Sequence, residues 1–233
     1  MGSRPIFINT AGFSPAKWTG TSAFRRGGGT AEPAVIRLLD ISVALIFLLV
    51  AAPLLVGLAL AIWAHDGACP IYAHRRIGRG GRSFPCLKFR SMVPDSAARL
   101  QHVLATDPAA AAEWARDHKL RNDPRITPLG RILRKSSLDE VPQLLNVIMG
   151  HMSLVGPRPI IESEIVRYGR YFHHYCSVRP GITGLWQVSG RNDVSYRRRV
   201  VLDTVYSRSK SLRTDLFVLT RTIPAVVSAR GCS

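Results

Sequence analysis

The chain has 233 residues, 46% of them hydrophobic, and 32 Lys and Arg against 15 Asp and Glu give it a formal net charge of +17. This length allows one domain of ordinary size plus an extra segment, and the charge requires an anionic partner: nucleic acid, anionic lipid or a phosphorylated substrate. No CxxC or metal-ligand spacing is present, which argues against a zinc site or a disulfide framework and indicates free thiols in a reducing compartment; the cysteines are Cys69, Cys86, Cys176 and Cys232.

The N-terminal residues divide into a polar stretch and an apolar one. Residues 1–32 are rich in Gly, Ser, Thr and Pro, which predicts a flexible tail, and the pattern of a cleaved signal peptide is missing. Residues 41–63 carry no charge and are long enough for a membrane helix. Pro53 is expected to break or kink this helix after Ala52. We therefore predict a membrane segment at 33–66.

Basic residues flank the apolar stretch on both sides, so the positive-inside rule places both of its ends in the cytoplasm. A re-entrant helix-break-helix with its bend at Ala52 and Pro53 satisfies this constraint. An ordinary kinked span and the buried helix of a soluble core remain open. The flanking residues are Arg25, Arg26 and Arg37 before the stretch, and His74, Arg75, Arg76, Arg79 and Arg82 after it.

A hairpin is predicted next, because extended runs at 70–74 and 84–90 enclose a Gly-rich loop at 78–82. Lys88 and Arg90 alternate with apolar residues, so they share one face of a strand. That face can bind an anion, and it can equally be an ordinary solvated face.

Helical patterns dominate the rest of the chain. Helices are expected at 95–119 with an interruption at Asp107-Pro108, at 162–175 and at 193–208. Leu212, Leu216, Leu219, Ile223 and Val227 form a stripe that packs on the core or lies in a membrane interface.

A glycine-rich segment at 178–192 lies between two of these helices. Its glycines permit close approach of the backbone to a ligand, and Arg179 and Arg191 add positive charge.

The stretch 134–159 carries the candidate chemistry. Ser137 and Glu140 have the spacing of a capping box, so a helix should begin near Leu138. Pro142 is tolerable only near such a beginning. Asp139 and Glu140 then lie in the first turn, where the helix dipole favours negative charge. An ionised Asp can act as a nucleophile, and a neighbouring Glu can hold magnesium.

Arg158 lies between two prolines in the run Gly156-Pro157-Arg158-Pro159. This run predicts a stiff, extended loop that presents one guanidinium, a group well suited to phosphate. An ordinary helix cap followed by an ordinary surface loop would give the same two local patterns. Their combination within so short a span favours a site.

Four blocks together resemble one family. They are KFRSM at 88–92, RKSSLDEVPQ at 134–143, SLVGPRP at 153–159 and RPGITG at 179–184. In this order and spacing they closely resemble the bacterial sugar transferases, the monotopic polyprenyl-phosphate phosphoglycosyl transferases, from about Ile36 to the C-terminus. The runs at 184–196 and 222–226 look most like the undecaprenyl-phosphate galactose phosphotransferases that start rhizobial exopolysaccharide synthesis.

The resemblance implies an α+β fold: a small, mostly helical catalytic domain at 67–233 with a short β-hairpin or sheet. It implies that this domain rests on the re-entrant segment and on interfacial amphipathic helices, at the cytoplasmic face of the bacterial inner membrane. The implied reaction moves a hexose-1-phosphate from UDP-galactose or UDP-glucose to undecaprenyl phosphate and releases UMP. This is the first membrane step of exopolysaccharide synthesis.

The resemblance also implies roles for individual residues. Asp139 would attack the β-phosphorus and form a covalent phosphosugar intermediate, and Glu140 would bind Mg²⁺. Many relatives have Ser-Pro at the helix break, whereas this chain has Ala52-Pro53 and lacks that hydroxyl. The candidate phosphate-binding residues are Lys88, Arg90, Arg134, Arg158, Arg179 and Arg191.

Other functions fit parts of the pattern. Charge alone suggests a membrane-anchored nucleic-acid-binding protein, but we see no recognition helix or aromatic platform and expect no nucleic-acid partner. A non-catalytic scaffold that recognises lipid headgroups, and an enzyme that transfers directly without a covalent intermediate, also stay open. The expected partners are the UDP-sugar, undecaprenyl phosphate and inner-membrane phospholipid. The sequence leaves the sugar, the polymer and a homo-oligomeric state undecided.

Overall fold

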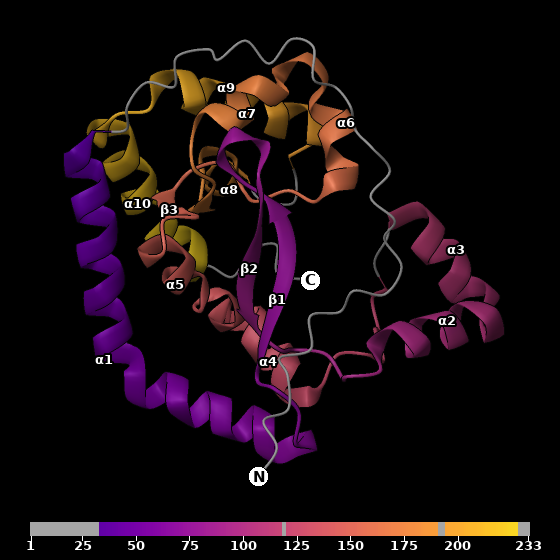
Figure 1. The fold of residues 1–233 in the computed structure, drawn as a ribbon. Helices are drawn as coiled ribbons and strands as arrows, with labels where there is room; N and C mark the ends of the chain where they lie inside the picture. Colours follow the sequence, from indigo (N-terminus) through magenta and orange to yellow (C-terminus); the bar gives the residue numbers. More distant parts are fainter. Residues whose placement is uncertain (1–32, 118–119, 191–193, 228–233) are drawn as a thin grey trace.

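A computed structural model describes residues 33–117, 120–190 and 194–227. A long apolar helix, α1 (Ala34–Asp66), passes along one side of a small α+β domain, as Figure 1 shows. The α+β class and the candidate membrane helix confirm the predicted fold class. The predicted tail at 1–32 lies outside the described residues.

The domain is built around a central hairpin, and short helices surround it (Figure 1). Strands β1 (Ile71–Ile77) and β2 (Ser83–Phe89) are antiparallel, with Ile71 opposite Phe89 and Ile77 opposite Ser83, so the predicted hairpin is confirmed. Two short strands, β3 (Ser153–Val155) and β4 (Gly181–Thr183), pair in parallel. The hairpin loop holds η1 (Arg79–Gly81), and the helices and turns after it are α2 (Ser96–Thr106), α3 (Pro108–Asp117), α4 (Pro128–Ser136), η2 (Leu138–Glu140), α5 (Gln143–Ile148), η3 (Glu162–Glu164), α6 (Ile165–Tyr168), η4 (Gly169–Tyr171), α7 (Phe172–Ser177), α8 (Leu185–Val188), α9 (Tyr196–Ser209) and α10 (Leu212–Val227).

Helix α1 continues through Pro53 without a break in its helical assignment, and Figure 1 shows it bent partway along its length. Most of its apolar surface is uncovered: Leu49 is 78% exposed and Val50 is 76% exposed. By length and composition it is able to cross a membrane. The helix thus contains Pro53 and is bent, which agrees with the predicted kink, but it is not broken.

Polar contacts fix the two ends of α1 to the domain. Near the first end, the Arg37 guanidinium donates to the carbonyls of Val147 (2.6 Å) and Ile148 (3.1 Å), and Asp40 accepts from the Ser153 hydroxyl (2.7 Å). Arg37, predicted as a flanking charge, therefore binds the C-terminal carbonyls of α5. At the other end, Asp66 forms a two-fold ion pair with Arg90, with N–O distances of 2.6 and 2.7 Å.

The predicted capping box at Ser137 is wrong. Ser137 has φ 59° and ends α4 in the left-handed conformation, whereas an N-cap residue needs extended backbone. Its side chain caps nothing, and Leu138 to Glu140 form a single 3₁₀ turn, η2. The α-helix begins only at Gln143, directly after Pro142, so the proline does mark a helix start. The two acids therefore lie on a tight turn between helices and not in the first turn of α5.

Two further helix predictions need correction. The segment at 162–175 is divided into η3, α6, η4 and α7, because Gly169 adopts φ 48° and interrupts the helix. In α10 the buried face centres on Val218 and Asp215, while Leu216 is 46% exposed and Ile223 is 68% exposed. The hydrogen bond that Tyr206 donates to Asp215 (2.6 Å) draws this polar residue into the core. α10 thus packs on the core through Val218 and Asp215, with Leu219 as the stripe residue that contacts the core cluster.

A buried acid connects α6 to α9. Asp203 is 2% exposed and accepts a hydrogen bond from the Tyr168 hydroxyl at 2.7 Å. Burial raises the pKa of Asp203 to about 7. Because the folded-state pKa lies above the unfolded one, the neutral form favours folding at low pH, and this contribution is lost as pH rises through about 7.

We expect Asp203→Asn to remove this pH dependence, because Asn keeps an acceptor for Tyr168 and carries no charge. The variant should match the wild type below about pH 4, gain on it as pH rises towards 7, and be more stable at pH 8. The upper limit is about 4 kcal/mol, at about 1.36 kcal/mol per pH unit between the two pKa values. Melting temperatures of both proteins across about pH 4 to 8 measure this. Parallel curves would contradict the assignment of the titration to Asp203.

Candidate active site

The site forms where three separate segments meet. Turn η2 presents Asp139 and Glu140, strand β2 presents Lys88, and the loop after β3 presents Arg158. One oxygen of Glu140, Oε1, accepts from Lys88 Nζ at 2.6 Å and from Arg158 Nη2 at 3.0 Å. The structure therefore brings four of the predicted site residues together.

Local packing sets the position of these segments. Asn146, buried in α5, accepts from the Leu87 amide (2.8 Å) and donates to the Pro85 carbonyl (2.7 Å), which fixes the edge of β2 beside η2. The polar Asn146 within the apolar run at 144–149 is the signal that sequence reasoning missed. Gln143, also buried, was missed as well and lines the site.

Glycines position the Arg158 loop. A Cβ on Gly156 would collide with the backbone of Gly181, and one on Gly184 would collide with the carbonyl of Gly156. The Gly156 amide donates to the Thr183 carbonyl at 2.9 Å. The predicted close approach at these glycines is therefore made by the chain's own backbone, which brings the 153–159 and 179–184 blocks together.

Positive charge acts on the two acids in different ways. Burial alone would raise the pKa of Glu140, but Arg158 and Lys88 outweigh it and lower the pKa to about 2. Burial raises the pKa of Asp139, and the charge of Glu140 adds to this, while Lys88, Arg134 and Arg158 oppose it. Glu140 is thus a fixed anion within an ion-pair network, whereas Asp139 is less deeply buried and forms no hydrogen bond with a cation among the described residues.

Arg134, at the end of α4, is the third cation that acts on Asp139. Its Nε donates to the Ser91 hydroxyl at 2.9 Å, and its charge acts on Asp139. This contact joins the 88–92 block to the 134–143 block. Asp139 therefore lies within the field of three cations, which is the setting that an anionic substrate needs when a carboxylate approaches it.

The other predicted phosphate-binding residues are Arg90, Arg179 and Arg191, and the first two have partners outside this cluster. Arg90 is paired with Asp66 at the end of α1, because it lies beyond the end of β2, away from Glu140. Arg179 donates through Nε to the carbonyl of Gly150 at 2.9 Å. Arg191 lies outside the described residues.

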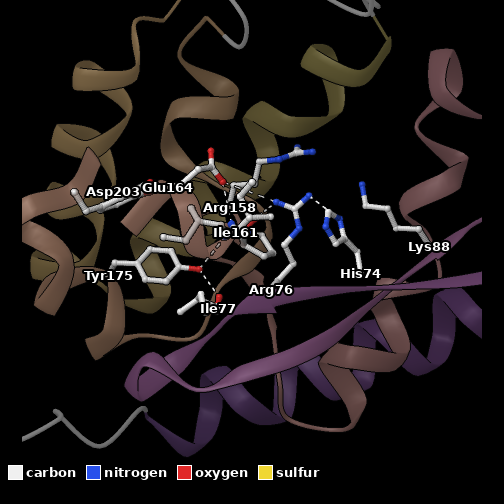
Figure 2. Close-up of polar contacts among 12 residues, drawn as sticks. His74, Arg76, Ile77, Lys88, Arg158, Ile161, Glu164, Tyr175 and Asp203 are labelled. Atoms are coloured by element: carbon white, nitrogen blue, oxygen red, sulfur yellow. Dashed lines mark hydrogen bonds and ion pairs between the residues drawn. The ribbon is translucent and has the colours of Figure 1, made fainter. Parts of the chain in front are cut away.

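An open hollow of about 240 Å³ adjoins Glu140. Arg76 lines it, a residue predicted only as a flanking charge. His74, predicted to carry a flanking charge too, does not do so at neutral pH: burial first, and then Arg76 and Lys88, lower its pKa to about 4. Figure 2 shows these side chains together, with Arg76 between His74 and the segment that carries Arg158. The hollow's other lining residues are Cys86, Lys88, Gln143, Arg158, Pro159 and Ile182.

The carboxylates of Asp139 and Glu140 fit a magnesium ion that takes most of its ligands from substrate phosphates and water. Within 33–117, 120–190 and 194–227, no group of three or more His, Cys, Asp or Glu residues forms a cage for a metal. Asp139 and Glu140 offer adjacent carboxylates, and one oxygen of Glu140 already contacts two cations. Mg²⁺ is commonly held by one or two carboxylates plus substrate phosphates and water. This pair matches that pattern.

Comparison with known proteins places the chain in a family. The family model described as "Bacterial sugar transferase" matches residues 31–229. This chain belongs to the bacterial sugar transferase family. Its 88–92, 134–143, 153–159 and 179–184 blocks all lie inside the matched region, so the resemblance read from them is confirmed.

Three relatives of this sugar transferase differ in how much of their length it covers. The UDP-galactose-lipid carrier transferase of Erwinia amylovora is 53% identical over 195 residues, 84% of this chain and 41% of the relative. The undecaprenyl-phosphate galactose phosphotransferase of Salmonella typhimurium is 50% identical with the same shares. The exopolysaccharide production protein ExoY of Sinorhizobium fredii is 46% identical over 231 residues, 99% of each chain. The chain therefore spans about two fifths of the first two relatives and nearly all of the third.

Proposed function

We propose that this sugar transferase moves a hexose-1-phosphate from a UDP-sugar to undecaprenyl phosphate, releases UMP, and so begins exopolysaccharide synthesis at the inner membrane. The observation that carries the proposal is the Asp139–Glu140 pair within the field of Lys88, Arg134 and Arg158. The relatives' names supply the donor class and the lipid acceptor. UDP-galactose is the first candidate donor and UDP-glucose the second, since one relative is named for glucose-1-phosphate transfer.

In the proposed first step, a carboxylate oxygen of Asp139 attacks the β-phosphorus of the UDP-sugar. A phosphorus–oxygen bond forms to Asp139, the bond to the bridging oxygen breaks, and UMP leaves with that oxygen. In the second step, an oxygen of undecaprenyl phosphate attacks the same phosphorus. Asp139 is released and the lipid diphosphate sugar is formed, so the residue ends each cycle as a carboxylate.

The surrounding residues stabilise charge in these steps. The charges of Arg134 and Arg158 act on Asp139 and reduce repulsion between its carboxylate and the phosphates. Glu140 keeps Lys88 and Arg158 fixed before substrate arrives. A Mg²⁺ ion held by Glu140 and Asp139 would act as a Lewis acid on phosphate oxygens when bound.

The direct test is UMP release in a panel of UDP-sugars, with undecaprenyl phosphate and Mg²⁺. We expect release with UDP-galactose or UDP-glucose that depends on the lipid for steady turnover. Release with N-acetylated donors alone would refute the hexose assignment and preserve the reaction class. An inactive wild type that binds DNA in a salt-dependent manner would refute the enzyme itself. Ping-pong kinetics support the covalent intermediate, and ternary-complex kinetics argue against it.

We also propose that α1 enters and leaves the membrane on the cytoplasmic side, with phospholipid around its exposed apolar face. Both ends of α1 contact the same domain, through Arg37 and Asp40 at one end and Asp66 at the other. A single cysteine in the tail at 1–32 should therefore resist an impermeant thiol reagent in intact cells. A cysteine in the exposed hairpin loop is the matched control. Labelling of the tail alone from outside would contradict re-entry.

The residue at the bend offers a second test of the same topology. Pro53→Leu restores a backbone N–H and removes the ring that bends the helix, so we expect it to shift α1 towards a straight span. The tail cysteine should then become accessible from outside in part of the population. An unchanged labelling pattern would mean that contacts with the domain, and not the proline, set the path of α1.

A further inference from the structure

The backbone that follows Arg158 is hydrogen-bonded to residues of other segments. The Pro159 carbonyl accepts from Arg76 Nη1 at 3.1 Å, and the Ile160 carbonyl accepts from the Ile77 amide at 2.9 Å. The Ile160 amide donates to the Tyr175 hydroxyl at 3.3 Å. Each of these backbone groups is therefore bound by β1 or α7 and not by the loop itself. Among these partners only Arg76 carries a charge.

Arg76 is itself fixed by a neutral histidine. Its Nη2 lies 3.2 Å from His74 Nδ1. A guanidinium only donates, so Nδ1 must accept and the proton of His74 is on Nε2. Glu164, whose carboxylate lies 4.0 Å from Arg76 Nη1, also accepts from the Ile161 amide at 2.9 Å. Figure 2 shows this arrangement, with the Arg76 side chain directed away from the strand and its guanidinium between His74 and the segment that carries Arg158.

The charge of Arg76 also bears on Arg158. The two guanidinium groups are close enough for Arg158 to lower the pKa of Arg76, after the larger effect of burial. Arg158 is therefore near a cation that repels it, and it contacts the Glu140 carboxylate, which attracts it, at 3.0 Å. The hydrogen bond to Pro159 fixes the backbone immediately after it.

We propose that Arg76 is a positioning residue for Arg158. It holds the Pro159 carbonyl, and its charge directs the Arg158 guanidinium towards Glu140. This inference rests on the proposed function, in which Arg158 stabilises charge during transfer. Arg76 also lines the hollow beside Glu140, so direct contact with a donor phosphate is the competing role that an experiment must separate.

A double-mutant cycle separates the two roles. Arg76→Gln, Arg158→Gln and the double variant are compared for kcat and KM in UMP release. If Arg76 acts through Arg158, Arg76→Gln lowers kcat by about 10- to 100-fold with little change in KM, as expected for a misplaced catalytic group. It should then cost less than about threefold further in the Arg158→Gln background. Losses that multiply, or a rise in the donor KM alone, would overturn the proposal.

Arg75→Gln is the matched control, because it removes the same charge from the neighbouring, exposed position of β1 and should behave as the wild type. Melting temperatures of all variants check the fold. If Arg76→Gln does not fold, Arg76→Lys replaces it in the cycle. Lys retains the charge but lacks the forked guanidinium that contacts Pro159 and His74 at once. We therefore expect Arg76→Lys to lower kcat less than Arg76→Gln does. That smaller loss of kcat must also disappear in the Arg158→Gln background.

Hydrogen exchange without substrate gives a readout that does not depend on activity. In Arg76→Gln, the peptide covering 156–161 should exchange at least about tenfold faster than in Arg75→Gln, because the loop exit has lost a bond. Unchanged exchange there would refute the positioning role even if the wild type proved inactive. If exchange is faster in Arg76→Gln but the wild type is inactive, the positioning of the loop by Arg76 is supported and the proposed function is refuted.

Discussion

Replacing Asp139 by Asn is expected to lower UMP release by at least about a thousandfold, the scale at which a covalent catalyst is lost. Asn keeps the shape of the side chain and removes the charge that would attack phosphorus. Lys88, Arg134 and Arg158 remain in place to bind the donor, so the donor KM should change far less than kcat. Steady-state rates of both proteins under saturating lipid measure the effect.

Stability provides the control for Asp139→Asn. Burial raises the pKa of Asp139 in the folded protein, so its neutral form favours folding at low pH, and that contribution disappears as pH rises through the folded-state pKa. At pH 8 the charged side chain is a cost that Asn removes. The variant should therefore melt at the same temperature as the wild type or higher while it is inactive.

A covalent adduct identifies the attacking group. Wild-type protein incubated with a UDP-sugar and no lipid, then digested, should carry the phosphosugar on the peptide that contains Asp139. Asp139→Asn should carry none. Substantial turnover by the variant, or an adduct on another residue, would refute this role for Asp139.

Glu140→Gln is expected to lower turnover by about a hundredfold or more, for a different reason. The Glu140 carboxylate accepts ion pairs from Lys88 and Arg158. A neutral amide leaves both cations without an anion, so Arg158 loses its orientation. It also weakens any Mg²⁺ ligation, so added magnesium should restore part of the activity. A titration of the rate against Mg²⁺ concentration measures this.

The two variants should differ in stability with opposite sign. Arg158 and Lys88 lower the pKa of Glu140 to about 2, so its charge stabilises the fold above its unfolded pKa and that contribution is lost only as pH falls towards 2. At neutral pH, Glu140→Gln should therefore melt below the wild type, whereas Asp139→Asn should not. If both variants melt alike and magnesium restores nothing, Glu140 is not the anion that organises the site.

Local patterns predicted the elements that depend on local forces. The uncharged run at 41–63, the Gly-rich loop at 78–82 and the break at Asp107-Pro108 each correspond to an observed element or boundary. The capping box failed because Ser137 ends the previous helix in a left-handed conformation, and this depends on how α4 meets η2. A four-residue motif does not contain that information.

The site was predictable in part, through spacing along the chain. The sequence singled out Lys88, Asp139, Glu140 and Arg158, and these residues meet. It could not separate Lys88 from Arg90, because their spacing predicts one shared strand face, whereas β2 ends at Phe89 and Arg90 pairs with Asp66. The sequence did not indicate a role for Arg76 in the site, because its contact with Pro159 joins residues 83 positions apart along the chain. Its other partner, His74, is 2 residues away.

The attachment of α1 at both ends has a consequence for how the protein reaches its final state. Arg37 and Asp40 bind backbone that exists only once α5 and β3 have formed, and Asp66 binds Arg90 only once the hairpin is paired. During synthesis the apolar helix emerges before any of these partners. In the proposed topology, α1 therefore first enters the bilayer before these contacts exist, and later folding of the domain must either keep that initial path of the helix or change it.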